Sequence, residues 1–244
     1  MFIETGKGNI YYEVNGEGPG VLFLHGLGGS LDSMYPIGES LKSYKRIYVD
    51  IPCHGKSDNF EINFDDISTF LVDLMKKLGL EKFYIVGISL GSLISENLII
   101  KHPDNVIKSV FISPSSHIDE NAMRKVFSWF NSEDGGTSTL FSKNFYETHK
   151  QEIMEYEKSH PLKTERLFYI SNEIMKFNIL NERSEKRCAI IYGEYDDLFG
   201  ERMLPYLKSV FLNCEIFKLN AGHAIHRESP QDAAIIIERF FEDP

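Results

Sequence analysis

A serine lies at the centre of the short pattern Gly87-Ile88-Ser89-Leu90-Gly91. Before it comes a continuous apolar run, Phe83 to Val86, which is typical of a strand buried on both faces. After it, a helical segment runs from Leu90 to His102. In such a strand-to-helix turn the central side chain stands clear of the sheet, and glycine on both sides prevents a clash. This context predicts that Ser89 is a nucleophile.

A serine hydroxyl is a weak nucleophile, and it needs an adjacent base that a third group orients. The chain has eight histidines, and the base is expected in a loop at the C-terminal ends of the strands, where such sheets bind ligands. His223 follows the last predicted strand and a glycine, whereas His226 lies three residues further on. The spacing favours His223 as the base, and His226 is expected to make a structural hydrogen bond near Glu228.

The orienting carboxylate is expected at the end of the preceding strand, where the sequence is Gly193-Glu194-Tyr195-Asp196-Asp197. Glu194 is expected to face solvent. Spacing alone does not separate Asp196 from Asp197. Either aspartate gives the chain order serine, acid, histidine, which differs from the other two orders known for this triad. The strand that ends at Ile112 offers Ser113 where an alternative acid would stand.

Acyl chemistry on a serine also needs hydrogen-bond donors for the negatively charged oxygen of the tetrahedral intermediate. The backbone N–H of Leu90, at the start of the helix, is one candidate. The second is the N–H of Leu27, in the loop His25-Gly26-Leu27-Gly28-Gly29-Ser30, whose glycines let the backbone approach a ligand closely. We also expect His25 and Gly26 to border the substrate pocket. The loop lacks the spacing of a phosphate-binding loop, so that interpretation is set aside.

These groups can meet only if a sheet brings the loops together. Buried strand-like runs alternate with amphipathic helical segments, which predicts a mostly parallel, doubly wound α/β sheet. The first 20 residues predict a hairpin. The predicted strands are 21–24, 46–50, 83–86, 106–112, 188–192 and 215–219, and the clearest helices are 64–78, 90–102 and 230–241.

The stretch from 117 to 184 breaks this alternation, because it has helical periodicity and no strand-like run. We therefore expect a core of residues 1–116 and 185–244, with residues 117–184 forming a helical insertion between two strands of the sheet. The stretch is rich in aromatic residues, and Trp129 and Phe130 are candidates for the substrate pocket. Packing of the insertion against the core explains the same aromatic residues equally well.

Composition narrows the class of partner. The chain of 244 residues carries 26 Lys and Arg against 36 Asp and Glu, a net charge of −10, which argues against a nucleic acid. Three scattered cysteines signal neither a zinc site nor a disulfide framework. There is no signal-like N-terminus and no apolar run long enough for a membrane span, so we expect a cytoplasmic protein. Nothing calls for a metal or a cofactor, and the oligomeric state stays open.

Taken together, these residues resemble the α/β-hydrolase superfamily over the whole chain. In the family pattern the acid lies three residues after the glycine of its block, which selects Asp196. The resemblance also implies that residues 117–184 form the family's helical cap, which is inserted after the sixth strand. The chain is most similar to small carboxylesterase and lipase-like members, including the pimeloyl-carrier methyl esterase type. The matching blocks are 25–28 (oxyanion loop), 50–58, 87–91 (nucleophile elbow), 193–196 (acid) and 222–223 (base).

The sequence departs from the family at several positions. Ser92 stands where many members have a third glycine, and Cys53 stands where Arg or Gly is frequent. A serine nucleophile argues against haloalkane dehalogenases and epoxide hydrolases, which use an aspartate. Menaquinone-pathway lyases of this fold carry an arginine soon after the elbow, where Leu93 and Ile94 stand here, so that activity is less favoured.

The sequence therefore predicts a serine hydrolase that cleaves a carboxylic ester or thioester of a small, mostly apolar substrate through an acyl-enzyme. Ser89 is the nucleophile, His223 the base and Asp196 the orienting acid. One alternative uses the same triad for acyl transfer, carbon–carbon bond hydrolysis or cofactor-free oxygenation, because a fold does not fix a reaction. Another is a ligand-sensing signalling protein that retains the triad.

Overall fold

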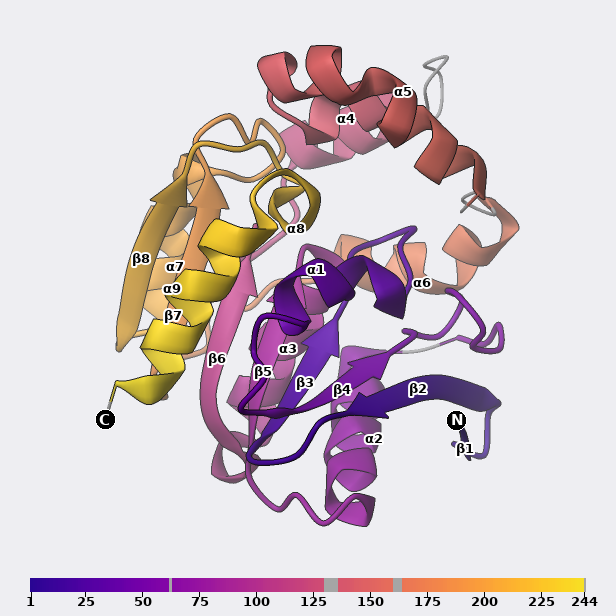
Figure 1. The fold of residues 1–244 in the computed structure, drawn as a ribbon, viewed down its shortest axis with the longest axis vertical. Helices are drawn as coiled ribbons and strands as arrows, with labels where there is room; N and C mark the ends of the chain where they lie inside the picture. The colour runs from indigo at the N-terminus through magenta and orange to yellow at the C-terminus, as the bar shows by residue number, and fades with distance from the viewer. Residues whose placement is uncertain (62, 130–135, 160–163, 244) are drawn as a thin grey trace.

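A single eight-stranded sheet runs through the molecule in the order β1-β2-β4-β3-β5-β6-β7-β8 (Figure 1). The computed structural model describes residues 1–61, 63–129, 136–159 and 164–243. The strands β3 to β8 pair in parallel, and β1 and β2 are antiparallel at one edge. The predicted doubly wound, mostly parallel α/β sheet is confirmed. The strands are β1 (Phe2–Glu4), β2 (Asn9–Asn15), β3 (Gly20–Leu24), β4 (Lys45–Val49), β5 (Phe83–Ile88), β6 (Val106–Ile112), β7 (Cys188–Gly193) and β8 (Cys214–Leu219).

The predicted N-terminal hairpin is formed by β1 and β2, in which Ile3 pairs with Ile10. The opposite edge of β2 does not pair with β3. It pairs with β4 instead, Val14 facing Ile47, because β4 lies between β2 and β3 in the sheet. The turns after Asn15 therefore carry the chain over β4 before it enters the parallel part of the sheet.

Apolar clusters cover both faces of the sheet, which is why the central strands are continuously apolar rather than alternating. Every residue of β3 is buried. The helices α2, α3 and α7 contribute to the cluster on one face, and α1, α8 and α9 to the cluster on the other. The helices are α1 (Tyr35–Gly38), α2 (Phe64–Lys77), α3 (Leu90–Lys101), α4 (Glu120–Trp129), α5 (Lys143–Ser159), α6 (Thr164–Lys176), α7 (Leu204–Val210), α8 (Ile225–Glu228) and α9 (Pro230–Glu242).

The segment between β6 and β7 carries α4, α5 and α6, and we call residues 117–184 the insertion. Its two ends lie side by side, since the Ile118 N–H donates to the Phe177 carbonyl (3.3 Å) and the Ile179 N–H to the Ser116 carbonyl (2.9 Å). The helices α4 and α5 lie over the C-terminal ends of the parallel strands (Figure 1). None of the helices that the structure describes is long and apolar enough to cross a membrane.

Candidate active site

The turn between β5 and α3 holds Ser89 in a backbone conformation that residues other than glycine rarely adopt, with φ 52° and ψ −112°. The flanking glycines leave no space for a side chain. A Cβ atom at Gly87 would lie 2.2 Å from the Gly91 carbonyl oxygen, and one at Gly91 would lie 2.1 Å from the Leu24 carbonyl oxygen. The sequence pattern is thus a packing requirement, and it presents the serine at the end of a central strand.

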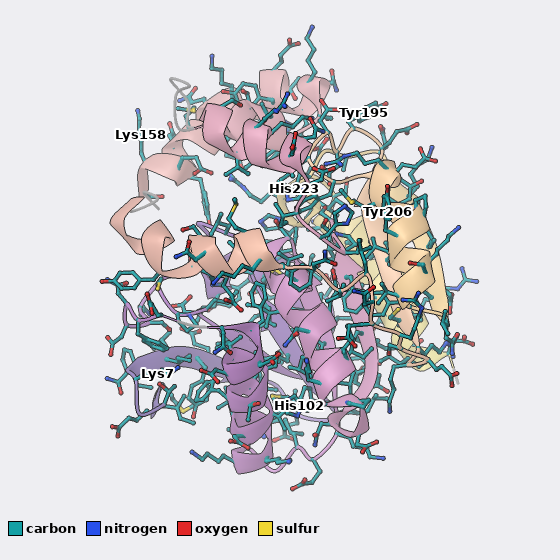
Figure 2. The ribbon with its side chains drawn as sticks, turned by 180° about the vertical axis from the view of Figure 1, so that it is seen from behind. Lys7, His102, Lys158, Tyr195, Tyr206 and His223 are labelled. Atoms are coloured by element: carbon teal, nitrogen blue, oxygen red, sulfur yellow. The ribbon has the colours of Figure 1, made fainter. Side chains whose placement is uncertain are left out.

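Three side chains from three loops form one chain of hydrogen bonds. The Ser89 Oγ lies 2.9 Å from Nε2 of His223, and Nδ1 of the same ring lies 2.8 Å from Oδ2 of Asp196. A carboxylate only accepts hydrogen bonds, so Nδ1 carries the proton and Nε2 accepts from the serine hydroxyl. Figure 2 shows His223 between the insertion and the strands of the core. The imidazole is therefore oriented to take a proton from the serine.

The carboxylate of Asp196 is buried and well supplied with donors. Besides His223, the N–H groups of Leu198 (2.9 Å) and Phe199 (3.0 Å) donate to its Oδ1. Burial alone raises the pKa of Asp196, but His223 and the two amides outweigh burial and leave this pKa lowered. The group is consequently ionised at neutral pH and can stabilise a positively charged imidazole.

The competing residues lie elsewhere. Asp197 is exposed, and its carbonyl oxygen accepts from Lys125 of α4. Glu194 is also exposed and pairs with Lys218 at 3.1 Å. Burial lowers the pKa of His226 to about 3, so this imidazole is neutral. The structure thus brings Ser89, His223 and Asp196 together and leaves the two other acids and His226 outside the chain of hydrogen bonds.

The glycine-rich loop after β3 lies against Ser89. A Cβ atom at Gly26 would be 3.6 Å from the Cβ of Ser89, so the neighbouring amide of Leu27 follows a residue in contact with the serine. The amide of Leu90 belongs to the first turn of α3, and the first N–H groups of a helix have no partner within the helix. Both amides are thus suited to the oxyanion role that the sequence predicts, which stays a prediction.

Of the residues proposed to border the substrate pocket, His25 is held within the glycine-rich loop. Its ring is fully buried, Nδ1 donates to the Gly26 carbonyl (2.8 Å), and Nε2 accepts from the Ile51 N–H (3.0 Å). Burial lowers its pKa to about 4. Both ring nitrogens are therefore used in shaping the loop. Trp129 ends α4, and Phe130 lies outside the described residues.

Two residues that support the histidine were not recognised as functional from sequence. The hydroxyl of Ser113, just after β6, donates to the carbonyl of His223 at 2.8 Å, and Ser113 has a positive φ of 48°. The carboxylate of Glu228 accepts from the Gly222 N–H at 2.9 Å. Each contact spans either many residues of sequence or a turn, so no local pattern indicates it.

A buried acid lies in α3, seven residues after Ser89. Glu96 is fully buried, and burial raises its pKa well above 4.5, although the Ser115 amide lowers it in part. A raised pKa means that, above pH 4.5, the folded state keeps a proton on Glu96 that the unfolded state releases. The free energy of unfolding therefore falls as the pH rises. Relative to Glu96→Gln, we expect the wild type to lose about 1.4 kcal/mol per pH unit between 4.5 and the raised pKa.

Urea unfolding of both proteins at pH 5 and pH 8 measures this difference. The advantage of Glu96→Gln in free energy of unfolding should be larger at pH 8. The same advantage at both pH values would show that Glu96 is ionised in the folded protein.

A hollow of about 390 Å³ lies between the start of α2 and the end of α6. Its lining is mostly polar and includes Asn63, Asp65 and Glu173 but none of the three hydrogen-bonded residues around Ser89. The Glu173 carboxylate accepts from the Phe64 N–H at 3.2 Å, so this side chain caps α2. The hollow is therefore separate from the candidate active site.

Known proteins place this geometry in a family. A family model described as the alpha/beta hydrolase fold matches residues 19–168, more than half of the chain. A curated relative, 2-succinyl-6-hydroxy-2,4-cyclohexadiene-1-carboxylate synthase of Enterobacter sp. (strain 638), is 26% identical over 238 residues, covering 88% of this chain and 89% of the relative.

Two solved structures share the fold at low sequence identity. One is MGS-M2, an alpha/beta hydrolase enzyme from a Medee basin deep-sea metagenome library (TM-score 0.88, 20% identity, 97% of this chain and 95% of that chain). The other is a thermophilic esterase from Thermogutta terrifontis (TM-score 0.83, 15% identity, 96% and 93%). With the sheet order, the glycine-flanked serine turn and the family model in agreement, the chain belongs to the α/β-hydrolase fold family.

Proposed function

We propose that the protein is a serine hydrolase that cleaves a carboxylic ester or thioester of a small, mostly apolar molecule. The observation that carries this proposal is the continuous hydrogen-bond chain from Ser89 through His223 to the buried Asp196. That arrangement supplies the three things an acyl-transferring serine needs: a base within reach, a fixed tautomer of that base, and a charge to stabilise its protonated form.

In the proposed reaction His223 takes the proton of the Ser89 hydroxyl as the oxygen attacks the carbonyl carbon. The amides of Leu27 and Leu90 bind the resulting oxyanion. His223 then donates the proton to the leaving alcohol or thiol, which leaves an acyl group on the serine. A water molecule, deprotonated by the same histidine, releases the acid and restores the enzyme. Asp196 keeps the imidazole in place through both halves.

Apolar side chains beside the histidine support an apolar substrate. The ring of Phe199 lies 5.6 Å from the ring of His223, edge to face. Phe199 is buried and belongs to the same apolar cluster as Ala122 of α4. We infer that residues 117–184 act as a cap over a core of residues 1–116 and 185–244, with Gly26 near the substrate.

A panel of p-nitrophenyl esters with acyl chains of increasing length tests the proposal. We expect saturable turnover that is fastest for one chain length. A fluorophosphonate should label the protein once, and peptide mass spectrometry should place the label on Ser89. No turnover of any ester, together with no labelling, would exclude the hydrolase.

A second candidate function is a lyase reaction on the same three residues, in place of ester hydrolysis, and it has one observation in its favour. The curated relative that covers most of the chain is named as a synthase, not as an esterase. Against this stand Leu93 and Ile94, at the positions where the sequence comparison with such lyases expects an arginine. Fluorophosphonate labelling of Ser89 without turnover of any ester in the panel would favour this second function over the first.

A further inference from the structure

We propose that Glu228 is a positioning residue for the catalytic base, and that it couples the placement of His223 to the docking of the insertion. This inference rests on the proposed function, because it assigns a role in that same site. Glu228 ends α8, five residues after His223, and nothing in its local sequence marks it as functional.

The carboxylate of Glu228 joins two segments that are distant in sequence. Its Oε2 accepts from the Gly222 N–H (2.9 Å), next to the histidine, and from the Ser142 N–H (3.0 Å), just before α5. Its Oε1 accepts from the Ser142 hydroxyl. One side chain therefore binds the loop of the base and the start of the main helix of the insertion at the same time.

The backbone on both sides of His223 is held at this contact. Before it, Gly222 packs so closely that a Cβ atom there would lie 2.5 Å from the backbone of Phe141. After it, the Ala224 N–H donates to the Leu140 carbonyl at 2.8 Å. From the end of β6, the Ser113 hydroxyl donates to the His223 carbonyl. The position of the imidazole thus depends on residues 140–142 of the insertion as well as on the core.

Two conservative variants separate the length of the Glu228 side chain from its charge. In Glu228→Gln the amide oxygen can face the two N–H donors, while its NH₂ group donates to the Ser142 hydroxyl, which then acts as the acceptor. In Glu228→Asp the charge stays but the side chain is one methylene shorter, so it cannot reach both segments. Positioning therefore predicts that glutamine is tolerated and that aspartate is not.

We expect Glu228→Asp to lower kcat roughly tenfold to 100-fold with KM within about twofold of wild type, since small displacements of a reacting group have effects of this size. The rate of fluorophosphonate labelling should fall in parallel, because it uses the same base. Glu228→Gln should keep both rates within about threefold of wild type, since its hydrogen bonds are retained.

A matched control is Glu157→Ala. Glu157 of α5 accepts from Arg227, the residue before Glu228, at 2.9 Å, so removing its carboxylate also breaks a contact between α8 and the insertion. It does not touch the loop of the base. We expect its rates to equal those of the wild type. If the control variant lost as much kcat as Glu228→Asp, any weakening of the contact between α8 and the insertion would be enough to lower activity. That result would overturn the specific role of Glu228.

Loss of activity in both Glu228 variants, in neither, or only in Glu228→Gln would also overturn the proposal.

An NMR measurement keeps this test separate from the proposed function. It follows the proton on Nδ1 of His223 as a low-field resonance in proton NMR spectra. It reports the bond to Asp196 without any turnover. The resonance should shift or broaden in Glu228→Asp and stay unchanged in Glu228→Gln. A wild type that neither labels nor turns over esters would exclude the hydrolase, whereas an unchanged resonance in Glu228→Asp would exclude the positioning role.

Discussion

Replacement of Ser89 by alanine is expected to lower kcat for ester hydrolysis by about 10⁶-fold, the size of effect that loss of the nucleophile has in a serine–histidine–aspartate triad. The reason is that Ser89 is the one hydroxyl within 2.9 Å of the histidine Nε2 in the described hydrogen bonds. Residual turnover would come only from the oxyanion donors and from substrate binding. A p-nitrophenyl ester assay at high enzyme concentration measures the remaining rate.

A serine-to-alanine substitution at the surface is the control for Ser89→Ala. Ser209 of α7 is exposed and donates only to the Tyr206 carbonyl among the described contacts, so Ser209→Ala should keep wild-type activity. Because triad members act as a unit, His223→Ala should lose about as much as Ser89→Ala, and the double variant should lose no more. Additive losses in the double variant would contradict a shared step and point to separate roles for the two residues.

The turn that carries Ser89 and the central sheet are predictable because their sequence signals are local. A strand-like run, two glycines around a serine and a helical segment follow one another within about 20 residues, and at Gly87 the atoms that leave no room for a Cβ atom belong to Gly91 and Ser95 of the same turn and helix. Strand β3 is buried on both faces, so its sequence is apolar without alternation. A reader of the sequence can therefore place the serine between a strand and a helix without knowing any long-range contact.

The charged side chains that hold the loops of Asp196 and His223 in place are not predictable from local sequence. Arg202 donates to the Leu198 carbonyl, within the loop of the acid, and pairs with Asp119 at the start of the insertion. Glu228 reaches Ser142 across 86 residues of sequence. Charged residues of these types are usually solvated at the surface, so their sequence gives no sign of a partner. Only the folded chain shows which charged side chains are bonded to the loops that carry Asp196 and His223.

The insertion is attached to both loops that carry the acid and the base. At the acid loop, Lys125 of α4 donates to the Asp197 carbonyl, and Asp119 pairs with Arg202. At the base loop, Ser142 binds Glu228. Movement of the insertion would therefore strain the hydrogen bonds beside Asp196 and His223. These contacts make the insertion a support of the loops that carry Asp196 and His223.

Two neighbouring aspartates give the sharpest test of the geometry. Asp196→Asn is expected to lower kcat by about 10⁴-fold, whereas Asp197→Asn should leave it within about threefold of wild type. An asparagine at 196 can offer an NH₂ group to Nδ1 of His223, which stabilises the tautomer that carries its proton on Nε2. That tautomer cannot accept the proton of the serine. Asp197 is exposed and engages only its backbone carbonyl in the described contacts, so its charge is dispensable.

The kcat of both variants, measured between pH 6 and 9 on the ester that the wild type prefers, decides between the two carboxylates. The two substitutions remove the same charge from adjacent positions, so a general electrostatic effect would lower both rates to a similar extent. A large loss confined to Asp197→Asn would show that the loop after β7 rearranges in solution and that the second aspartate orients the base. A loss confined to Asp196→Asn requires the bonded and buried carboxylate, because only its side chain meets the imidazole, at 2.8 Å.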